Sequence, residues 1–446
     1  MANQTVETTC CVVGGGPAGM MLGYLLARAG VAVTVLEKHQ DFNRDFRGDT
    51  VHPSTLEIMH ELGILDDFLK VPHQKITSAG GLYGNYAFTA ADFASLPTHC
   101  NYVALMPQWD FLDFLADKAK QLPSFTLRMQ NEATDLIHEA GRIQGVVAKL
   151  PKGTAEIRSD LVVGCDGRHS LTRQAAGFEV QEFGVPIDVL WFRINADSTT
   201  PEHLLGNLNY GKALVLIPRG DYYQAGLVIR KGSFEQIQAE GLEEFRRQLR
   251  LIAPFLGEQV EQLRDWEQVR LLSVQINRLR RWHRPGLLCI GDAAHAMSPA
   301  GGVGINLAIQ DAVAAANILA GPLRSGRVTE KLLDSVQCRR EFPTRAIQLL
   351  QVNMHKGLMT VFRNPGPAKA PWQLKVMVNI PGVQHGMARV LGLGIRQEHI
   401  AGARKQPACN VPLLAKVAIG AGVALAGAVM AGRLIRAFRK PSYGWR

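Results

Sequence analysis

The sequence has no cysteine arrangement that would hold a metal ion or build a disulfide framework. Its seven cysteines form no Cys-x-x-Cys pair and no Cys/His cluster with ligand spacing. The first residues also lack the basic start and the cleavable apolar stretch of a signal peptide. We therefore expect no metal site, reduced thiols and a cytoplasmic location.

Basic runs interleaved with aromatic residues are absent as well. The formal net charge is +10, and part of the excess lies near the C-terminus. Such a charge suits an anionic cofactor or reductant as well as a polyanionic partner. We expect no nucleic-acid partner.

The patterns along the 446 residues predict an α/β protein of more than one domain. Strand, glycine turn, helix and strand follow one another over residues 8–36, which is a βαβ unit. Sheet-like patterns with Pro, Gly and Asp turns occupy about 185–230, a single amphipathic helix is expected over 234–251, and the nucleotide-fold pattern returns near 286. The predicted division is a Rossmann-like domain at 1–180 and 281–365, interrupted by a sheet-rich domain at 181–280 and followed by a helical tail at 366–446.

Within the tail, residues 417–432 carry no charge and lie between Lys416 and Arg433. A bilayer span needs about 20 apolar residues, and this segment is shorter and rich in Ala and Gly. Three alternatives stay open: a packed helix, an anchor on a membrane surface, and a true span. Peripheral membrane contact through the tail is therefore one expectation.

The strongest local motif is GGGPAG at residues 14–19, between the first strand and the first helix. Gly14 permits the tight turn, Gly16 lets the backbone approach a pyrophosphate, and Gly19 lets the helix pack on the strand. The helix N-terminus offers free N–H groups to phosphates, and an acid at the end of the second strand can bind a ribose diol. The predicted dinucleotide site comprises Gly14, Gly16, Pro17, Ala18, Gly19, Glu37 and Lys38; the motif alone does not separate FAD from NAD.

A second glycine-rich loop, GDAAHAMSPAGGVGIN, follows a later strand at residues 291–306. Asp292 stands at the strand end, and the loop opens a long apolar helix. Such a loop can bring backbone N–H groups and a helix dipole to an electron-rich ring or a phosphate.

This loop resembles the second FAD motif of the flavoprotein aromatic hydroxylases, the p-hydroxybenzoate hydroxylase-like monooxygenases. The third motif of that family, an Asp-Gly followed by Ser and Arg, appears as GCDGRHSLTR at residues 164–173. All three motifs occur in the family's order, and the resemblance covers about residues 7–350. A second complete dinucleotide fingerprint is absent, as expected of a family whose reductant binds without its own Rossmann domain.

The resemblance implies a role for each matching residue. The motif glycines would hold the FAD pyrophosphate, Glu37 the adenosine ribose, and Asp292 the ribityl or pyrophosphate side. Asp166 would serve a site shared by FAD and the nicotinamide cofactor, and Pro299 would lie near the reacting flavin edge. The residues that would contact the flavin itself are Arg47, Gln108, Gly302, Val303, Gly304, Ile305 and Asn306.

The resemblance also implies an activity: a single-component FAD-dependent monooxygenase that uses NADPH or NADH and dioxygen. It would hydroxylate an aromatic or related small substrate, which can be lipophilic, through a flavin hydroperoxide in a site that excludes water. The alternative is a flavin-dependent reductase or dehydrogenase of the same fold, acting on a polyprenyl-type substrate. A monomer and a homodimer are both compatible with the sequence.

No catalytic base can be named from the sequence, and Pro299 is the one candidate beside the flavin. The sheet-rich domain offers Trp191, Arg193, Tyr222 and Tyr223 as substrate-site candidates. Aromatic residues in strands more often pack in a core, so these candidates are weak.

Overall fold

The computed structural model describes residues 4–43, 50–195 and 206–401. In this part of the chain the first sheet has eight strands, five of them parallel. The parallel strands follow the order β20 (Leu287–Cys289), β11 (Thr154–Gly164), β1 (Gln4–Val13), β2 (Val33–Glu37) and β8 (Phe125–Met129). Strand β19 (His283–Arg284) pairs antiparallel with β20, and the hairpin of β9 (Glu132–Glu139) and β10 (Arg142–Lys149) extends β11.

Helix α1 (Pro17–Arg28) connects β1 to β2 and completes the predicted βαβ unit. Every residue from Ala18 to Ala27 is buried, because α1 lies between the sheet and the helices α4 (Gln108–Lys120) and α8 (Gly304–Arg324). The expected α/β, Rossmann-like fold is confirmed by this arrangement.

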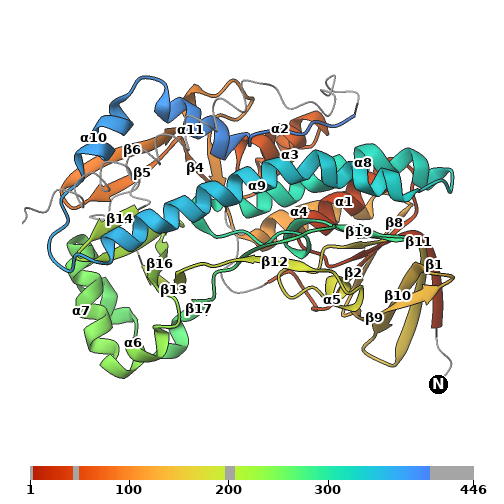
Figure 1. Cartoon of the computed structure of the whole chain (residues 1–446), viewed down its shortest axis with the longest axis horizontal. Helices are drawn as coiled ribbons and strands as arrows, with labels where there is room; N and C mark the ends of the chain where they lie inside the picture. The colour runs from red at the N-terminus through yellow and green to blue at the C-terminus, as the bar shows by residue number, and fades with distance from the viewer. Residues whose placement is uncertain (1–3, 44–49, 196–205, 402–446) are drawn as a thin grey trace, which may run out of the picture.

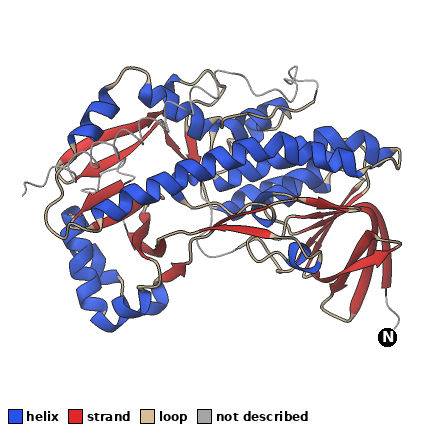
Figure 2. Cartoon of the chain, viewed as in Figure 1, coloured by secondary structure: helices blue, strands red, loops and turns tan. Residues whose placement is uncertain are grey.

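Two long helices cross the molecule (Figures 1 and 2). Helix α8 packs on α1, and α9 (Glu330–Val361) packs on α8 and contacts both β19 of the first sheet and β15 of the second. Among the described residues, one helical stretch, Ala300–Arg324, is long and apolar enough to cross a membrane. Most of it is buried inside the protein, as in a core helix.

The second sheet has seven strands among the described residues. Their order is β17 (Arg270–Leu272), β13 (Ile187–Asn195), β16 (Tyr222–Arg230), β15 (Lys212–Pro218), β14 (Gly206–Asn209), β5 (Ser78–Tyr83) and β6 (Tyr86–Asp92). Strands β5 and β6 come from the chain before residue 180, so the sheet recruits a hairpin from outside 181–280. The predicted domain division stays a prediction.

Helices α6 (Phe234–Glu240) and α7 (Leu242–Ile252) and the 3-10 segments η2 (Pro254–Gln262) and η3 (Trp266–Gln268) follow β16. Phe192 of β13 meets Phe245 of α7, with ring centroids 5.5 Å apart. The single helix predicted over 234–251 is wrong. Gly241 divides it, because its φ of 94° and ψ of 156° lie outside the helical region.

Shorter elements join the two sheets. Strands β3 (Thr50–Val51) and β4 (Gln74–Ile76) both pair with β7 (Val103–Leu105), and β12 (Val180–Phe183) pairs with β18 (Ile276–Leu279). Further short elements are helices α2 (Pro53–Glu61), α3 (Leu65–Phe68) and α5 (Leu171–Ala175) and the 3-10 turn η1 (Phe93–Ser95).

The described C-terminal part is helical, as predicted. Helices α10 (Trp372–Asn379) and α11 (Val383–Gly392) pack against β6 and against each other. Residues 417–432, for which three alternatives were open, lie outside the described residues.

Candidate active site

The three sequence motifs begin at one edge of the first sheet. Val13 pairs in register with Gly164, and Gly164 with Cys289, so β1, β11 and β20 end side by side. The carboxyl ends of parallel strands at such an edge are where open α/β sheets bind their ligands. The motifs are separated by more than 100 residues along the chain, and the sheet brings them together.

The first motif is shaped as a cradle. Gly14 has a φ of 104°, and a Cβ there would lie 2.5 Å from the carbonyl oxygen of Cys165. A Cβ on Gly19 would lie 2.0 Å from the carbonyl oxygen of Gly14, so α1 starts in direct contact with the turn. A Cβ on Gly16 would meet no atom within 4 Å, which leaves open space beside the backbone that begins α1. That combination fits a bound pyrophosphate at Gly16.

The N-terminus of α1 and the end of β2 complete this cradle. Gly16 is the N-cap, and no side chain caps the helix, so its first N–H groups remain available to a phosphate. Glu37 is buried and accepts hydrogen bonds from the backbone N–H groups of Gly15 and His39, both at 3.0 Å. These bonds fix the carboxylate beside the turn, where a ribose would lie. Lys38, the next residue, is exposed.

The third motif is tied to the second by an ion pair. Arg168 Nε donates to Asp292 Oδ2 at 3.1 Å, and the same guanidinium donates to the carbonyl oxygen of Met297. Asp166 faces α5 instead: its carboxylate accepts from the Ser170 hydroxyl at 2.6 Å and from the backbone and hydroxyl of Thr172, both at 2.9 Å. Asp166 therefore holds the start of α5, and its predicted role toward a nicotinamide stays a prediction.

Residues 298–306, here called the predicted flavin loop, are held from one side by β3 and α2. Asn306 Oδ1 accepts from the backbone of His52 at 2.9 Å and from the hydroxyl of Thr55 at 2.8 Å. Thr50 donates to the carbonyl oxygen of Gly302 at 2.8 Å, and a Cβ on Gly302 would lie 2.4 Å from that hydroxyl. Asn306 is thus buried and engaged in positioning the loop.

From the other side, α9 binds the same loop with a buried polar stripe. The Gln351 side chain accepts from the backbone N–H of Ser298 at 3.1 Å and donates to the carbonyl oxygens of Ser298 and Ala300. His355 Nε2 lies 2.9 Å from the Ser298 hydroxyl. Burial lowers the pKa of His355 to about 4, so the ring is neutral at pH 7. The stripe comprises Gln337, Arg340, Thr344, Gln348, Gln351 and His355, all buried and spaced by three or four residues.

Asp311 of α8 is the centre of a buried charge cluster behind the loop. Its carboxylate lies 2.6 Å from His295 Nε2, accepts from Arg340 Nε at 2.8 Å and accepts from the backbone N–H of Gly291 at 3.1 Å. Burial alone would raise the pKa of Asp311, but His295 and Arg340 lower it below its usual value. Arg340 also pairs with Glu398 at 3.3 Å, which joins the C-terminal segment to the cluster.

His52 connects the loop to α11. Its Nδ1 lies 2.7 Å from the carbonyl oxygen of Leu391, so Nδ1 carries a proton and donates it. Burial lowers the pKa of His52 to about 4. The neutral ring links the start of α2 to α11, and the backbone N–H of the same residue links it to Asn306 of α8.

The structure gives positions for some of the residues that are predicted to contact the flavin. It does not test their contacts with FAD. Gln108 is the first residue of α4 and is half-buried, and Pro299 opens the 3-10 turn η5 (Ala300–Gly302). Arg47 lies outside the described residues. The roles of these residues toward FAD stay predictions.

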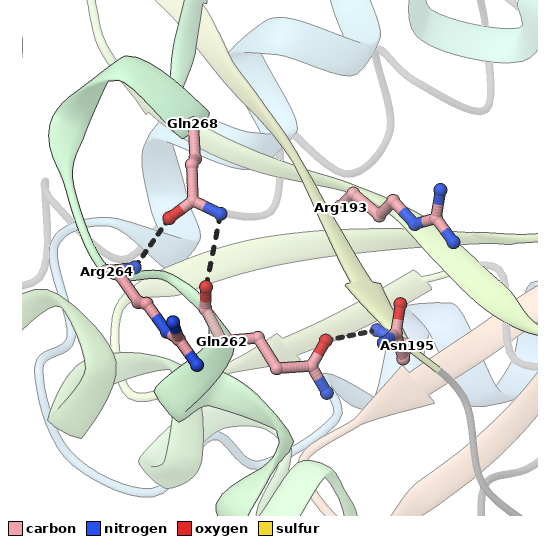
Figure 3. Close-up of a pocket in the computed structure, with 5 residues that line it drawn as sticks. All are labelled: Arg193, Asn195, Gln262, Arg264 and Gln268. Carbon is pink, nitrogen blue, oxygen red and sulfur yellow. Dashed lines mark hydrogen bonds between the residues drawn. The ribbon is translucent and has the colours of Figure 1, made fainter.

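The substrate-site candidates of the second sheet separate into two kinds. Tyr223 is buried in the core, and Trp191 packs its ring against Gly226. Arg193 lies over the ring of Tyr222, 3.9 Å from its centroid, and lines a cleft of about 370 Å³. The cleft lies at the end of β13 (Figure 3), and its lining consists of Arg193, Asn195, Gln262, Arg264 and Gln268. None of the predicted FAD-binding residues lines it, so it is distinct from the cradle.

Comparison with known proteins identifies the family. Residues 7–349 match the family model described as FAD binding domain. The chain is 32% identical to the 6-methylpretetramide 4-monooxygenase of Streptomyces rimosus over 80% of this chain and 86% of that protein. It is 28% identical to a rifampicin monooxygenase of Streptomyces venezuelae over 87% of this chain and 79% of that protein.

Among solved structures, the anhydrotetracycline hydroxylase OxyS from Streptomyces rimosus superposes with a TM-score of 0.70 at 22% identity. The superposition covers 92% of this chain and 79% of that chain, and it shows the shared fold. The cradle, the two further motifs and the family match agree. The chain belongs to the FAD-binding flavoprotein aromatic hydroxylases and is an FAD-dependent monooxygenase.

Proposed function

We propose that the chain uses NADPH or NADH and dioxygen to hydroxylate an electron-rich ring of a polycyclic aromatic small molecule. The observation that carries the proposal is the common sheet edge at Val13, Gly164 and Cys289, where all three FAD motifs begin. The substrate class is proposed from the relatives, whose names specify 6-methylpretetramide and rifampicin. When bound, FAD would supply the oxygen-activating redox chemistry.

The chain's own residues would hold the cofactor and limit its surroundings. Gly16 and the N-terminus of α1 would face the pyrophosphate, and Glu37 would orient the ribose. The predicted flavin loop is held by Asn306 on one side and by Gln351 on the other. A loop fixed from both sides suits chemistry that needs a defined ring position and little water.

The alternative is reduction of a polyprenyl-type substrate on the same fold. It differs in oxygen use, because a hydroxylase consumes oxygen and a reductase does not. The experiment follows NADPH and NADH oxidation together with oxygen uptake on FAD-loaded protein, with a panel of polycyclic phenols and polyprenyl compounds. A phenol that accelerates both rates equally and gains one oxygen atom supports the proposal. Substrate reduction that proceeds only without oxygen would replace it by the reductase.

Location and assembly belong to the proposal as well. We propose a cytoplasmic protein, monomeric or homodimeric, whose C-terminal region contacts a membrane. Sedimentation velocity of the full chain separates the monomer from the homodimer.

A further inference from the structure

Charge is divided unevenly along this chain. Residues 1–341 contain 34 Lys and Arg against 38 Asp and Glu, a net charge of −4. Residues 342–446 contain 15 Lys and Arg and one acid, Glu398, a net charge of +14. Glu398 is fully buried and paired with Arg339 and Arg340, so it does not offset the charge at the surface. The positive charge of the whole protein thus comes from its C-terminal quarter.

The same region exposes an apolar helix face. The described residues include six large apolar side chains that are strongly exposed, and three of them belong to α10 or its C-cap. Trp372 is 67% exposed, Val376 52% and Ile380 40%. Their spacing of four residues places them on one face of the helix. Val378, on another face, is buried, because α10 packs with that side toward β6 and α11.

Exposed basic side chains occur before, within and after α10 along the sequence. Lys369 precedes α10, Lys375 lies within it, and Arg389 belongs to α11. Lys356 and Arg363, near the end of α9, are also exposed. Figure 1 shows α10 at the upper left of the molecule with α11 beside it, and the N-terminus on the opposite side.

The chain continues for 45 residues beyond α11 and the segment that follows it, from residue 402 to residue 446. That stretch contains no acid, and its uncharged segment 417–432 lies between basic residues on both sides. An apolar segment with flanking cations is typical of sequences that lie on anionic lipid surfaces.

We infer that the α10 face, formed by Trp372, Val376 and Ile380, docks on an anionic lipid bilayer. Three properties favour a bilayer over a protein partner. Trp prefers the boundary between lipid and water. The basic charge has one sign over more than 100 residues, which suits an extended anionic surface. The apolar face and the uncharged tail segment belong to the same part of the chain.

Helix α11 connects this surface to the predicted flavin loop. Helix α11 directly follows α10, its Leu391 accepts from His52, and a Cβ on Gly301 would lie 3.3 Å from the Leu391 side chain. Docking would therefore hold one wall of the loop near the bilayer, where a lipophilic substrate is concentrated. The inference does not depend on the proposed reaction, since lipid binding is measured without turnover.

The test is co-sedimentation of the full-length, FAD-loaded protein with vesicles. One set contains phosphatidylcholine alone, and the other contains phosphatidylcholine with phosphatidylglycerol. We expect binding to the second set only, weakened by salt, and at least tenfold weaker binding for the double variant Trp372→Ser, Val376→Ser. The matched control is Leu271→Ser, because Leu271 of β17 is 46% exposed on a different sheet edge and should leave binding unchanged.

Four results would overturn the inference. The protein could stay in the supernatant with both vesicle sets, or bind both sets equally. The double variant could bind as well as the natural sequence, which would assign binding to the tail alone. The double variant could instead dissociate a dimer without any vesicle binding, which would show that the α10 face contacts a second copy. Circular dichroism and FAD content of the variants establish that they are folded.

Discussion

The open space beside Gly16 predicts a substitution that separates cofactor binding from folding. Gly16 has a φ of −73°, which any residue adopts, and a Cβ there would touch nothing within 4 Å. Gly16→Ala should therefore fold normally as apoprotein. Reduced entropy of the unfolded chain favours Ala by about 0.4–1 kcal/mol, whereas Ala is a poorer N-cap, so we expect a net change within about 1 kcal/mol.

The same methyl group would occupy the space predicted for the FAD pyrophosphate. Overpacking at a close contact costs about 1–3 kcal/mol, which corresponds to roughly 5- to 150-fold weaker FAD binding. Gly19→Ala is the matched comparison, because its Cβ would lie 2.0 Å from the carbonyl oxygen of Gly14. That variant should lose stability even without FAD, since α1 must move away from the turn.

The assay combines urea unfolding of the apoprotein with titration of FAD, followed by flavin fluorescence. The expected pattern is an unchanged unfolding midpoint and a raised Kd for Gly16→Ala, and a lowered midpoint for Gly19→Ala. An FAD affinity of Gly16→Ala within twofold of the natural sequence would refute the placement of the pyrophosphate. A destabilised Gly16→Ala apoprotein would refute the open space itself.

Further predictions concern the buried polar groups behind the loop. Asp311→Asn should lower the free energy of unfolding by about 3–5 kcal/mol, because the buried Arg340 would lose its closer carboxylate and keep only Glu398, which it shares with Arg339; a loss below about 1 kcal/mol in urea would contradict this. The lowered pKa of Asp311 means that its stabilisation is present above the unfolded pKa and is lost as pH falls through the lower folded pKa. Urea unfolding from pH 7 to 3 should show a larger loss in the natural protein than in Asp311→Asn, because His52 and His355 contribute the same loss to both. Burial lowers the pKa values of His52 and His355 to about 4, so each ring should reduce the free energy of unfolding by on the order of 3 kcal/mol as the pH falls from 6.5 to 4. His52→Asn or His355→Asn should flatten the plot of unfolding free energy against pH in that range. An unchanged slope in both variants would oppose the burial of the neutral rings. Gln351→Leu removes three hydrogen bonds to the predicted flavin loop and should cost about 1–3 kcal/mol and change the fluorescence of bound FAD; unchanged stability and fluorescence would exclude a role in holding the loop.

Local patterns were sufficient for the nucleotide-binding core. The strand, turn and helix over residues 8–29 are each specified by nearby residues: apolar runs, Gly14 in the turn and Pro17 at the first helical position. The order of the motifs then implied the fold, since β1, β11 and β20 must end together to bring them to one site. The family match confirms the fold and the FAD-binding character.

The buried stripe of α9 was missed because a polar helical stripe usually marks a solvent face. Its partners, Asp311 and the loop at Ser298, lie tens of residues away in the chain, and only the tertiary fold brings them against α9. One hint was present: Gln348, Gln351 and His355 are uncharged, whereas solvent faces of helices are usually rich in Lys and Glu.

One wrong prediction and one strand pairing that the sequence analysis did not predict have a similar origin. Gly241 lies within an amphipathic pattern, and only its positive φ reveals the division between α6 and α7. The pairing of β5 with β14 joins residues 78–83 to residues 206–209, a long-range contact that no local pattern contains. For the substrate site, the sequence supplied candidates, and the structure assigns Tyr223 and Trp191 to packing.

The most direct test of the central claim is turnover under ¹⁸O₂ with FAD-loaded protein, NADPH or NADH, and a polycyclic phenol that accelerates oxidation of the reductant. The account predicts a product heavier by one ¹⁸O atom per NAD(P)H consumed. A product that gains hydrogen but no oxygen, or one whose new oxygen atom is unlabelled because it comes from water, would contradict the monooxygenase.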